Sequence, residues 1–386
     1  MKTNGIGWVG VLVAGGLPLV ACGEQRMRFS AHDGSFPTTT GTSHTGSTDG
    51  GAGASGSPGD TEPIVENARR LFAAYGSACV ITDENEPVCF GLVTHAFDWP
   101  TPTTTGPVME IVISPDGACA LLEDGAVQCW GTDNFSATAP PSGSFTAIAE
   151  NGFDVFCALD REHRTHCWGH PQYLTEPPAQ KLFAIVGGEF GRFCGLTEAG
   201  DALCWGAPVF EIPTATTEGP FTELAPGNHV CGLGVDGGVR CWDAQPTSEK
   251  WGATEAPAGS FSSVVSRNVH SCALTKAGKA ICWGRLHVEF ESEVGDESPE
   301  LLVAPDETFT SIVTGQAHMC GLTTSGEARC WGYGTSADDI YNEPNLGQAS
   351  PPEGTFVELA AGDWHTCGLR DDGDVECWGM IAVPEP

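Results

Sequence analysis

Apolar and polar residues alternate along this chain in short runs that recur at a regular spacing. Runs such as FTAIAE at 145–150 and FTSIVT at 309–314 open on a Phe and then alternate apolar with polar or small residues. Each is followed by a second apolar segment, a turn and a Cys-Trp-Gly ending, as in MCGLTTSGEARCWG at 319–332. Short alternating runs bounded by turn residues predict strands and hairpins. No amphipathic helix of useful length lies between them, so we expect an all-β fold.

The hairpin segment occurs eight times, and successive copies begin 37 to 48 residues apart. Periods of this length are typical of propellers and solenoids. In every copy a first cysteine is followed by a second cysteine ten residues later. The pairs are Cys79 and Cys89, Cys119 and Cys129, Cys157 and Cys167, Cys194 and Cys204, Cys231 and Cys241, Cys272 and Cys282, Cys320 and Cys330, and Cys367 and Cys377.

The cysteine spacing predicts a disulfide across each hairpin. A three-residue loop centred between the cysteines ends six residues after the first one, where six copies have Gly and the other two have Asn85 and His163. These residue types favour the left-handed conformation that such a loop requires. The two cysteines then face each other with Cα atoms about 4.5 Å apart, which is within reach of a disulfide. Free buried thiols or a metal site are the alternatives, although no C-x-x-C pair, which structural zinc sites favour, is present.

The N-terminus predicts export and anchoring. Residues 1–21 combine one early Lys with a short apolar run that is too rich in Gly and Pro for a good membrane-spanning helix. The ending Leu-Val-Ala-Cys resembles the lipobox of a bacterial lipoprotein, which implies cleavage before Cys22 and lipidation of that residue. Cys22 is also the odd one of the 17 cysteines. We expect an outer-membrane lipoprotein; an ordinary secretion signal and a retained anchor are the alternatives.

Composition separates a tether from a folded domain and limits the partners. Residues 22–63 are dominated by Gly, Ser and Thr and cannot bury enough apolar surface to fold, so we expect a flexible tether and then a propeller domain at 64–386. The net charge of −33 argues against nucleic-acid partners, which require cationic phosphate contacts. It also leaves the lipid as the means of membrane attachment. The acidity is either a solubilising surface or an attraction for a basic partner or divalent cations.

The repeated FTxI run, the HxCAL segment and the G-x-x-x-CWG ending together resemble the RCC1 repeat family, named after the regulator of chromosome condensation. The resemblance covers about 64–380 and implies a closed β-propeller with one blade per repeat. Propellers of that family commonly have seven blades, whereas this chain has eight hairpin units, so seven and eight blades both stay open. The first unit departs from the pattern with Phe90 in place of Trp. The exchange activity of the nuclear member on a small GTPase is not carried over, because none of its partner-contacting residues can be matched.

Candidate chemistry in the sequence is sparse. Four histidines, at 229, 270, 318 and 365, lie two residues before a first cysteine. Their recurrence favours hydrogen bonds to the backbone of a neighbouring strand over catalysis, and a ring of metal-binding histidines is the alternative. His163, His166 and His170 are close in sequence, but the turn at His163 separates their faces. The links at 285–308 and 333–355 are candidates for recognition, the second through Tyr333, Asp338, Asp339 and Tyr341.

We therefore expect a monomeric, non-catalytic module that binds an unidentified protein partner, with no cofactor and no metal. The alternatives are a hydrolase or lyase with its site in the mouth of the ring, and a passive envelope component.

Overall fold

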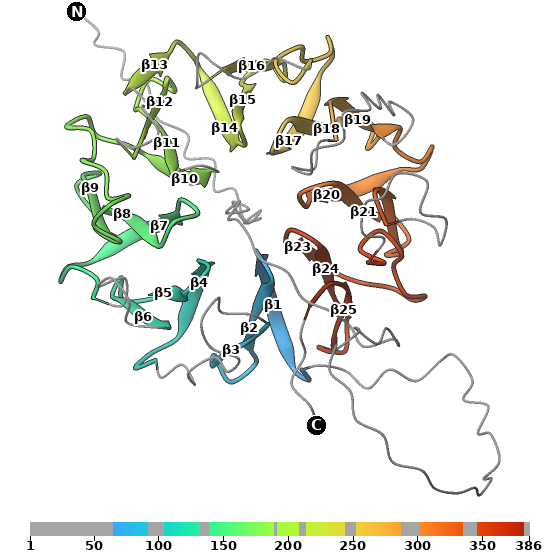
Figure 1. The fold of residues 1–386 in the computed structure, drawn as a ribbon, viewed down its shortest axis with the longest axis horizontal. Coiled ribbons are helices and arrows are strands. Elements are labelled where there is room, and N and C mark those ends of the chain that lie inside the picture. The colour runs from blue at the N-terminus through green and yellow to red at the C-terminus, as the bar shows by residue number, and fades with distance from the viewer. Residues whose placement is uncertain are drawn as a thin grey trace, which may run out of the picture.

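The computed structural model describes residues 65–91, 104–131, 139–188, 191–207, 214–243, 252–286, 302–334 and 346–381. These residues form 25 strands in eight separate antiparallel sheets. Figure 1 shows the sheets arranged as blades around a centre, with the first and last blades side by side. The expected all-β propeller is confirmed, and the open question of blade number is answered as eight.

Each blade is contiguous in sequence, and its opening strand lies innermost (Figure 1). The blades, numbered along the chain, consist of the following strands: blade 1, β1 (Ala68–Ala74), β2 (Ser77–Thr82) and β3 (Pro87–Gly91); blade 2, β4 (Val108–Ile113), β5 (Gly117–Leu122) and β6 (Val127–Gly131); blade 3, β7 (Phe145–Glu150), β8 (Val155–Asp160) and β9 (Thr165–Gly169); blade 4, β10 (Ala184–Gly188), β11 (Arg192–Leu196), β12 (Ala202–Gly206) and β13 (Ala215–Thr217); blade 5, β14 (Phe221–Pro226), β15 (His229–Gly234) and β16 (Val239–Asp243); blade 6, β17 (Phe261–Arg267), β18 (His270–Thr275) and β19 (Ala280–Gly284); blade 7, β20 (Phe309–Thr314), β21 (His318–Thr323) and β22 (Ala328–Gly332); and blade 8, β23 (Glu358–Ala361), β24 (His365–Leu369) and β25 (Val375–Gly379).

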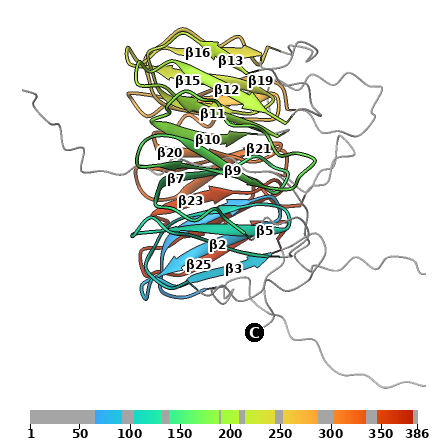
Figure 2. The ribbon, with the colours of Figure 1, turned by 90° about the vertical axis from the view of Figure 1, so that its left-hand side faces the viewer.

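The strands run between the two faces of the ring, as the side view in Figure 2 shows. The first hairpin of each blade, which joins its inner and middle strands, therefore lies at one face, and we call it the inner hairpin. The second hairpin, which carries the two cysteines on its strands, turns at the other face, which we call the turn face. No helix long and apolar enough to cross a membrane occurs among the described residues.

The turn glycines have the predicted conformation. Gly326, for example, has φ of 86°, and its N–H donates to the carbonyl of Thr323 at 3.0 Å, which closes the three-residue loop. The two non-glycine residues at this position, Asn85 and His163, both have φ of 65°. Left-handed backbone at these positions explains why Gly dominates there.

All eight hairpin disulfides are present, and their Cα atoms are 4.0 to 4.1 Å apart. The register pairs the two cysteines directly, as in Cys320 with Cys330. The first cysteine is fully buried in every blade, and in blades 1–7 it lies in one cluster with the opening and Trp side chains of the next blade. Cys320, for example, packs on Phe356 and Trp378. The disulfides therefore belong to the core between blades as well as to the hairpins.

The ring closes by repeating the contacts that join its other blades. In the regular junctions the N–H of the opening residue donates to the carbonyl of the preceding turn glycine, as Phe356 does to Gly326 at 2.7 Å. Ala68 of blade 1 makes the same bond to Gly373 of blade 8 at 2.8 Å. Smaller residues fill this last junction, because Ala68 stands where most other blades have Phe, and Phe90 stands where they have Trp. One further contact is specific to the closure: Val65 forms an antiparallel bridge with Val375 of β25, whose N–H donates to the Val65 carbonyl at 2.9 Å.

Candidate functional site

The inner hairpins of several blades carry buried polar side chains. Their contacts join blades that are not neighbours, so these hairpins must converge at the axis. We call this group the axial cluster; its members are Tyr75, Glu150, Asp154, Arg192, Arg267 and Asp363. Tyr75 and Asp154 have φ of 55° and 54°, a conformation that is uncommon for non-glycine residues and is enriched at functional sites.

Glu150 at the end of β7 is the centre of the cluster on one side. Its Oε2 accepts a hydrogen bond from the hydroxyl of Tyr75 at 2.8 Å, which joins blade 3 to blade 1, and its Oε1 accepts from the N–H of Gly152 at 2.6 Å. Burial and the nearby Asp154 raise the pKa of Glu150 well above its usual range, although the hydrogen bonds and Arg267 act in the opposite direction. The arrangement therefore favours a neutral carboxyl group.

Arg267 and Asp363 form an ion pair between blades 6 and 8. Their side chains are 1% and 0% exposed. The N–H of Asp363 also donates to the carbonyl of Tyr75 at 2.9 Å, which connects this pair to the ring closure. A buried ion pair of this kind contributes to a unique arrangement mainly because the loss of one partner leaves an uncompensated charge.

The four recurrent histidines lie between consecutive blades. His229 Nε2 shares a hydrogen bond with Ser271 Oγ at 2.6 Å, His270 with Thr314 Oγ1 at 2.7 Å, and His318 with Thr366 Oγ1 at 2.8 Å. The predicted contact with a neighbouring blade is thus present. These three bonds go to side-chain hydroxyls, and backbone groups of the next blade contribute as well, at Asn268 for His229, His365 for His318 and Ser77 for His365. Burial lowers the pKa of His270, His318 and His365 to about 3 and that of His229 to about 4. These imidazoles are neutral structural groups.

One group of possible metal ligands occurs in the described part of the chain, namely His229, Cys231 and Cys241. The two sulfurs form a disulfide and therefore offer no thiolate. This group is a blade junction rather than a metal centre.

The three histidines near the blade 3 turn have separate partners. His163 stacks on Phe183 at 3.9 Å between ring centroids, and His170 lies 4.7 Å from Tyr173. His166 Nε2 is 2.9 Å from Asp160 Oδ2. They do not converge on one point, in agreement with the predicted turn between them.

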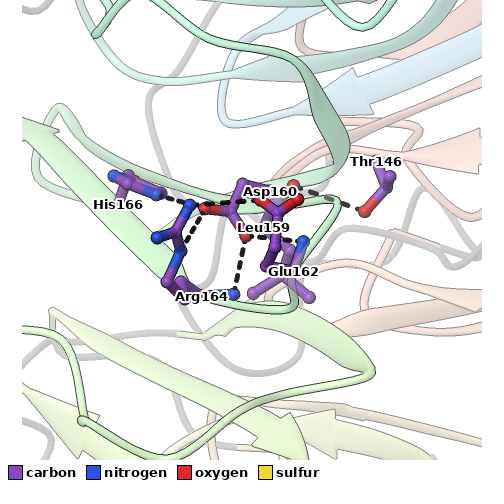
Figure 3. Close-up of polar contacts among 6 residues, drawn as sticks. All are labelled: Thr146, Leu159, Asp160, Glu162, Arg164 and His166. Carbon is purple, nitrogen blue, oxygen red and sulfur yellow. Dashed lines mark hydrogen bonds and ion pairs between the residues drawn. The ribbon is translucent and has the colours of Figure 1, made fainter.

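Figure 3 shows the polar contacts of Asp160 in this turn. Its Oδ1 accepts from the backbone N–H groups of Glu162 and Arg164, both at 2.9 Å, and its Oδ2 accepts from Arg164 Nε at 2.7 Å. Burial opposes ionisation, but the bonds from His166 and Arg164 prevail and hold the pKa of Asp160 well below its usual range. In blade 7, Thr323 Oγ1 accepts the equivalent backbone bond at 3.0 Å. Asp160 therefore accepts the turn's backbone hydrogen bond with a carboxylate, where blade 7 uses a hydroxyl.

The remaining predicted site residues fall mostly outside the described residues. Cys22, Asp338, Asp339 and Tyr341 lie there. Tyr333 is half-buried and packs against the cluster of Ala317, Trp364 and Met380 and against the core of the blade 6–blade 7 junction.

The axial cluster was not identified from the sequence. The available signal was the run of Asn, Asp and Arg residues in the inner hairpins, which interrupts the apolar strands at 150–154, 267–268 and 363.

Comparison with known proteins agrees with this architecture. The model of the family "Regulator of chromosome condensation (RCC1) repeat" matches residues 309–336 and 356–380, which are repeats in blades 7 and 8. No curated protein matches the chain.

Several solved structures are similar in fold. The CRINKLY WD40 ectodomain of the Arabidopsis thaliana receptor kinase ACR4 is 21% identical, with a TM-score of 0.51, over 71% of this chain and 97% of that chain. The ectodomain of the Physcomitrella patens receptor kinase CR4 is 24% identical, with a TM-score of 0.51, over 71% and 73%. Prp20p from Saccharomyces cerevisiae is 19% identical over 61% and 72%, with a TM-score of 0.42 that carries no weight. Two repeats of this chain, in blades 7 and 8, match the RCC1 repeat, and its eight like blades form a β-propeller.

Proposed function

We propose that the protein is a lipid-anchored extracytoplasmic propeller that acts as a non-catalytic protein-interaction module on the cell envelope. The observation that carries the proposal is the disulfide in every blade, buried at the junction with the next blade. Disulfides at eight equivalent places require an oxidising compartment to form and persist. The lipobox-like ending before Cys22 supplies the route to such a compartment and the anchor.

An interaction role is supported by the fold and by the way its polar core is used. RCC1-like propellers are mainly binding or exchange-factor proteins. Glu150 is hydrogen-bonded to Tyr75, Arg267 is paired with Asp363, and three of the four recurrent histidines bond to the next blade. These groups hold hairpins in place, which is a structural task, and a rigid ring of this kind presents its loops for recognition.

The anchor is tested by metabolic labelling in a bacterium with two membranes. The full chain is expressed in the presence of an alkyne fatty acid, alongside a Cys22→Ser variant. We expect label on the wild-type chain and none on the variant, with the wild-type protein in the outer-membrane fraction. Unlabelled wild-type protein that is released in soluble form would favour the ordinary secretion signal.

The interaction role is tested by photo-crosslinking of the anchored chain in intact cells. We expect one protein to be crosslinked reproducibly and in near-stoichiometric amount, and the same amount with a Glu150→Gln variant that retains the fold. Repeated absence of a crosslinked protein would favour a passive envelope component. A hydrolytic or lyase activity that is abolished in Glu150→Gln would instead favour an enzyme.

A further inference from the structure

The four recurrent histidines form one buried row along the inner hairpins of blades 5 to 8. We call it the histidine row; its members are His229, which is 2% exposed, and His270, His318 and His365, which are 0% exposed. The first three rings bond to a hydroxyl of the next blade, and the fourth interacts with the backbone of Ser77 in blade 1. Four consecutive blade junctions therefore each hold one imidazole away from water.

The four junctions are linked because the partner of each ring lies close to the next ring. Ser271, which bonds to His229, is adjacent to His270, and Thr366, which bonds to His318, is adjacent to His365. The partner of His270 lies at the end of β20, in the inner hairpin that leads to His318. Separation of one junction therefore displaces the hairpin that positions the following ring.

The charges that face the histidine row are mainly positive. Arg192 on β11 acts on His229, and Arg267 on β17 acts on the other three rings. Of the carboxyl groups near Arg267, Asp363 is ion-paired with it, and Glu150 on β7 is held in a neutral form. A proton on any ring of the row would thus be a buried positive charge among like charges, which is unfavourable.

The rings also oppose one another's protonation. His229 acts on His270, and both His270 and His365 act on His318. Burial and these neighbouring charges lower the pKa of His229 to about 4 and that of each of the other three to about 3. An imidazole in water has a pKa of about 6.5. The row is therefore neutral while it is buried, and it takes up protons below this pH once its junctions separate.

The other half of the ring lacks such a row. At the equivalent positions blades 1 to 4 have residues that do not change charge between pH 5 and 8, namely Ser77, Gly117, Val155 and Arg192. Glu150, which joins blade 3 to blade 1, has a pKa raised by burial, so acid favours its buried neutral form. Acid thus acts in opposite directions on the inner hairpins of the two halves.

We infer that the histidine row is an acid-sensitive switch, which below about pH 6 separates the inner hairpins of blades 5 to 8 as one unit while blades 1 to 4 stay closed. The disulfides between the middle and outer strands remain in the separated state, so each blade keeps its second hairpin and can close again at neutral pH. The switch goes beyond the proposed interaction role, because it makes the shape of one half of the ring depend on pH. A partner held by blades 5 to 8 would be released in acid.

The test is hydrogen–deuterium exchange of the full chain at pH 7.5 and pH 5, measured by mass spectrometry on peptides that contain the inner hairpins. After correction for the intrinsic pH dependence of exchange, protection in blades 5 to 8 should fall at least about thirtyfold, which is the effect of one histidine, and further where several are exposed together. Protection of the inner hairpins of blades 1 to 3 should fall less than about twofold. An equal fall in both halves, or no fall in either, would overturn the switch.

The variant His318→Gln tests whether the row acts as one unit. Gln stays neutral at both pH values and can still bond to Thr366, so we expect the acid effect to shrink about thirtyfold in all four inner hairpins of the row. The matched control is His163→Asn, because Asn85 has the same φ of 65° at the same turn position in blade 1, and it should leave the acid effect unchanged. A change confined to blades 7 and 8 would overturn the single unit. These measurements need no partner, so the interaction role stands or falls separately by crosslinking.

Discussion

Blades 5–8 and blades 1–4 are built from one repeat but stabilise their inner hairpins differently. At the position two residues before the first cysteine, blades 5–8 have His229, His270, His318 and His365, whereas blades 1–4 have Ser77, Gly117, Val155 and Arg192. The histidine half joins consecutive blades through imidazole–hydroxyl bonds. The other half instead joins blades 1 and 3 through Tyr75 and Glu150.

The comparison shows which part of the repeat fixes the fold. The disulfide, the turn conformation and the apolar junction are common to both halves, while the polar contacts at the axis differ. The backbone arrangement therefore follows from the shared junction. The axial residues set the local stability and its response to pH.

The largest effect is expected where the histidine half is joined across the ring. Arg267→Met leaves the buried carboxylate of Asp363 without its partner, and we expect a loss of about 3–5 kcal/mol in the free energy of unfolding. Urea denaturation measures it. The control is Arg267→Met with Asp363→Leu, which removes both charges and should recover most of the loss. A loss below about 1 kcal/mol in the single variant would show that the pair is not buried in solution.

Acid should weaken the histidine half. The pKa of His318 is about 3 in the folded chain, against 6.5 for an ordinary histidine. Below pH 6.5 the unfolded chain therefore binds more protons than the folded chain, and the free energy of unfolding decreases as the pH is lowered. At pH 5 this amounts to about 2 kcal/mol per such histidine. Unfolding of wild type and His318→Gln between pH 7.5 and 5 should show a shallower pH dependence for the variant; parallel curves would mean that His318 titrates normally in the folded protein.

The glutamate half should respond to acid in the opposite direction. Because the pKa of Glu150 is raised in the folded chain, the folded state binds the proton more readily, and stability from this residue increases as pH falls toward 4.5. Tyr75→Phe removes the bond that joins blades 1 and 3 and should cost about 1 kcal/mol. Thermal unfolding at pH 5 and pH 8 measures the loss in Tyr75→Phe against the wild-type chain, and the pH dependence when Glu150→Gln, which cannot ionise, is compared with the wild-type chain. A Glu150→Gln variant with an unchanged pH dependence would be inconsistent with a neutral Glu150.

The smallest expected effect would extend the histidine contacts across the ring closure. His229 and His318 bond to residues immediately before the first cysteine of the next blade, but the residue facing His365 at that place is Ala78. Both ring nitrogens of His365 are buried without a side-chain partner among the described residues, and only the backbone of Ser77 forms a hydrogen bond with this ring. Ala78→Ser should add the missing bond and stabilise the chain by about 0.5–1 kcal/mol. Ala118→Ser, at the same place in blade 2 where no histidine precedes it, is the control and should destabilise.

Local rules were sufficient to predict the hairpins. The ten-residue cysteine spacing and the Gly at the end of each loop depend on neighbouring residues only, and the register of Cys367 with Cys377 follows from them. The family resemblance gave the ring. Blade number was not predictable, because whether an eighth unit closes the ring depends on how Ala68 meets Gly373, about 300 residues away in the chain.

The axial contacts were beyond sequence reasoning for the same reason. The pairing of Arg267 with Asp363 skips the blade between them, so no spacing in the sequence reports it. The hydroxyl partners of the histidines were missed because they do not occupy one position of the repeat. Ser271 and Thr366 immediately precede a first cysteine, whereas Thr314 lies at the end of an opening strand. Side-chain partners across a ring are set by the closed geometry rather than by the repeat.

The central claim is that each blade carries its own disulfide within a closed ring of eight like units. Mass spectrometry of the mature protein after digestion at low pH without reduction tests it directly. The account predicts eight bridges, each between cysteines ten residues apart, of which Cys79–Cys89 and Cys367–Cys377 flank the closure. A bridge between cysteines of two different blades, or free thiols at any of these sixteen positions, would contradict it.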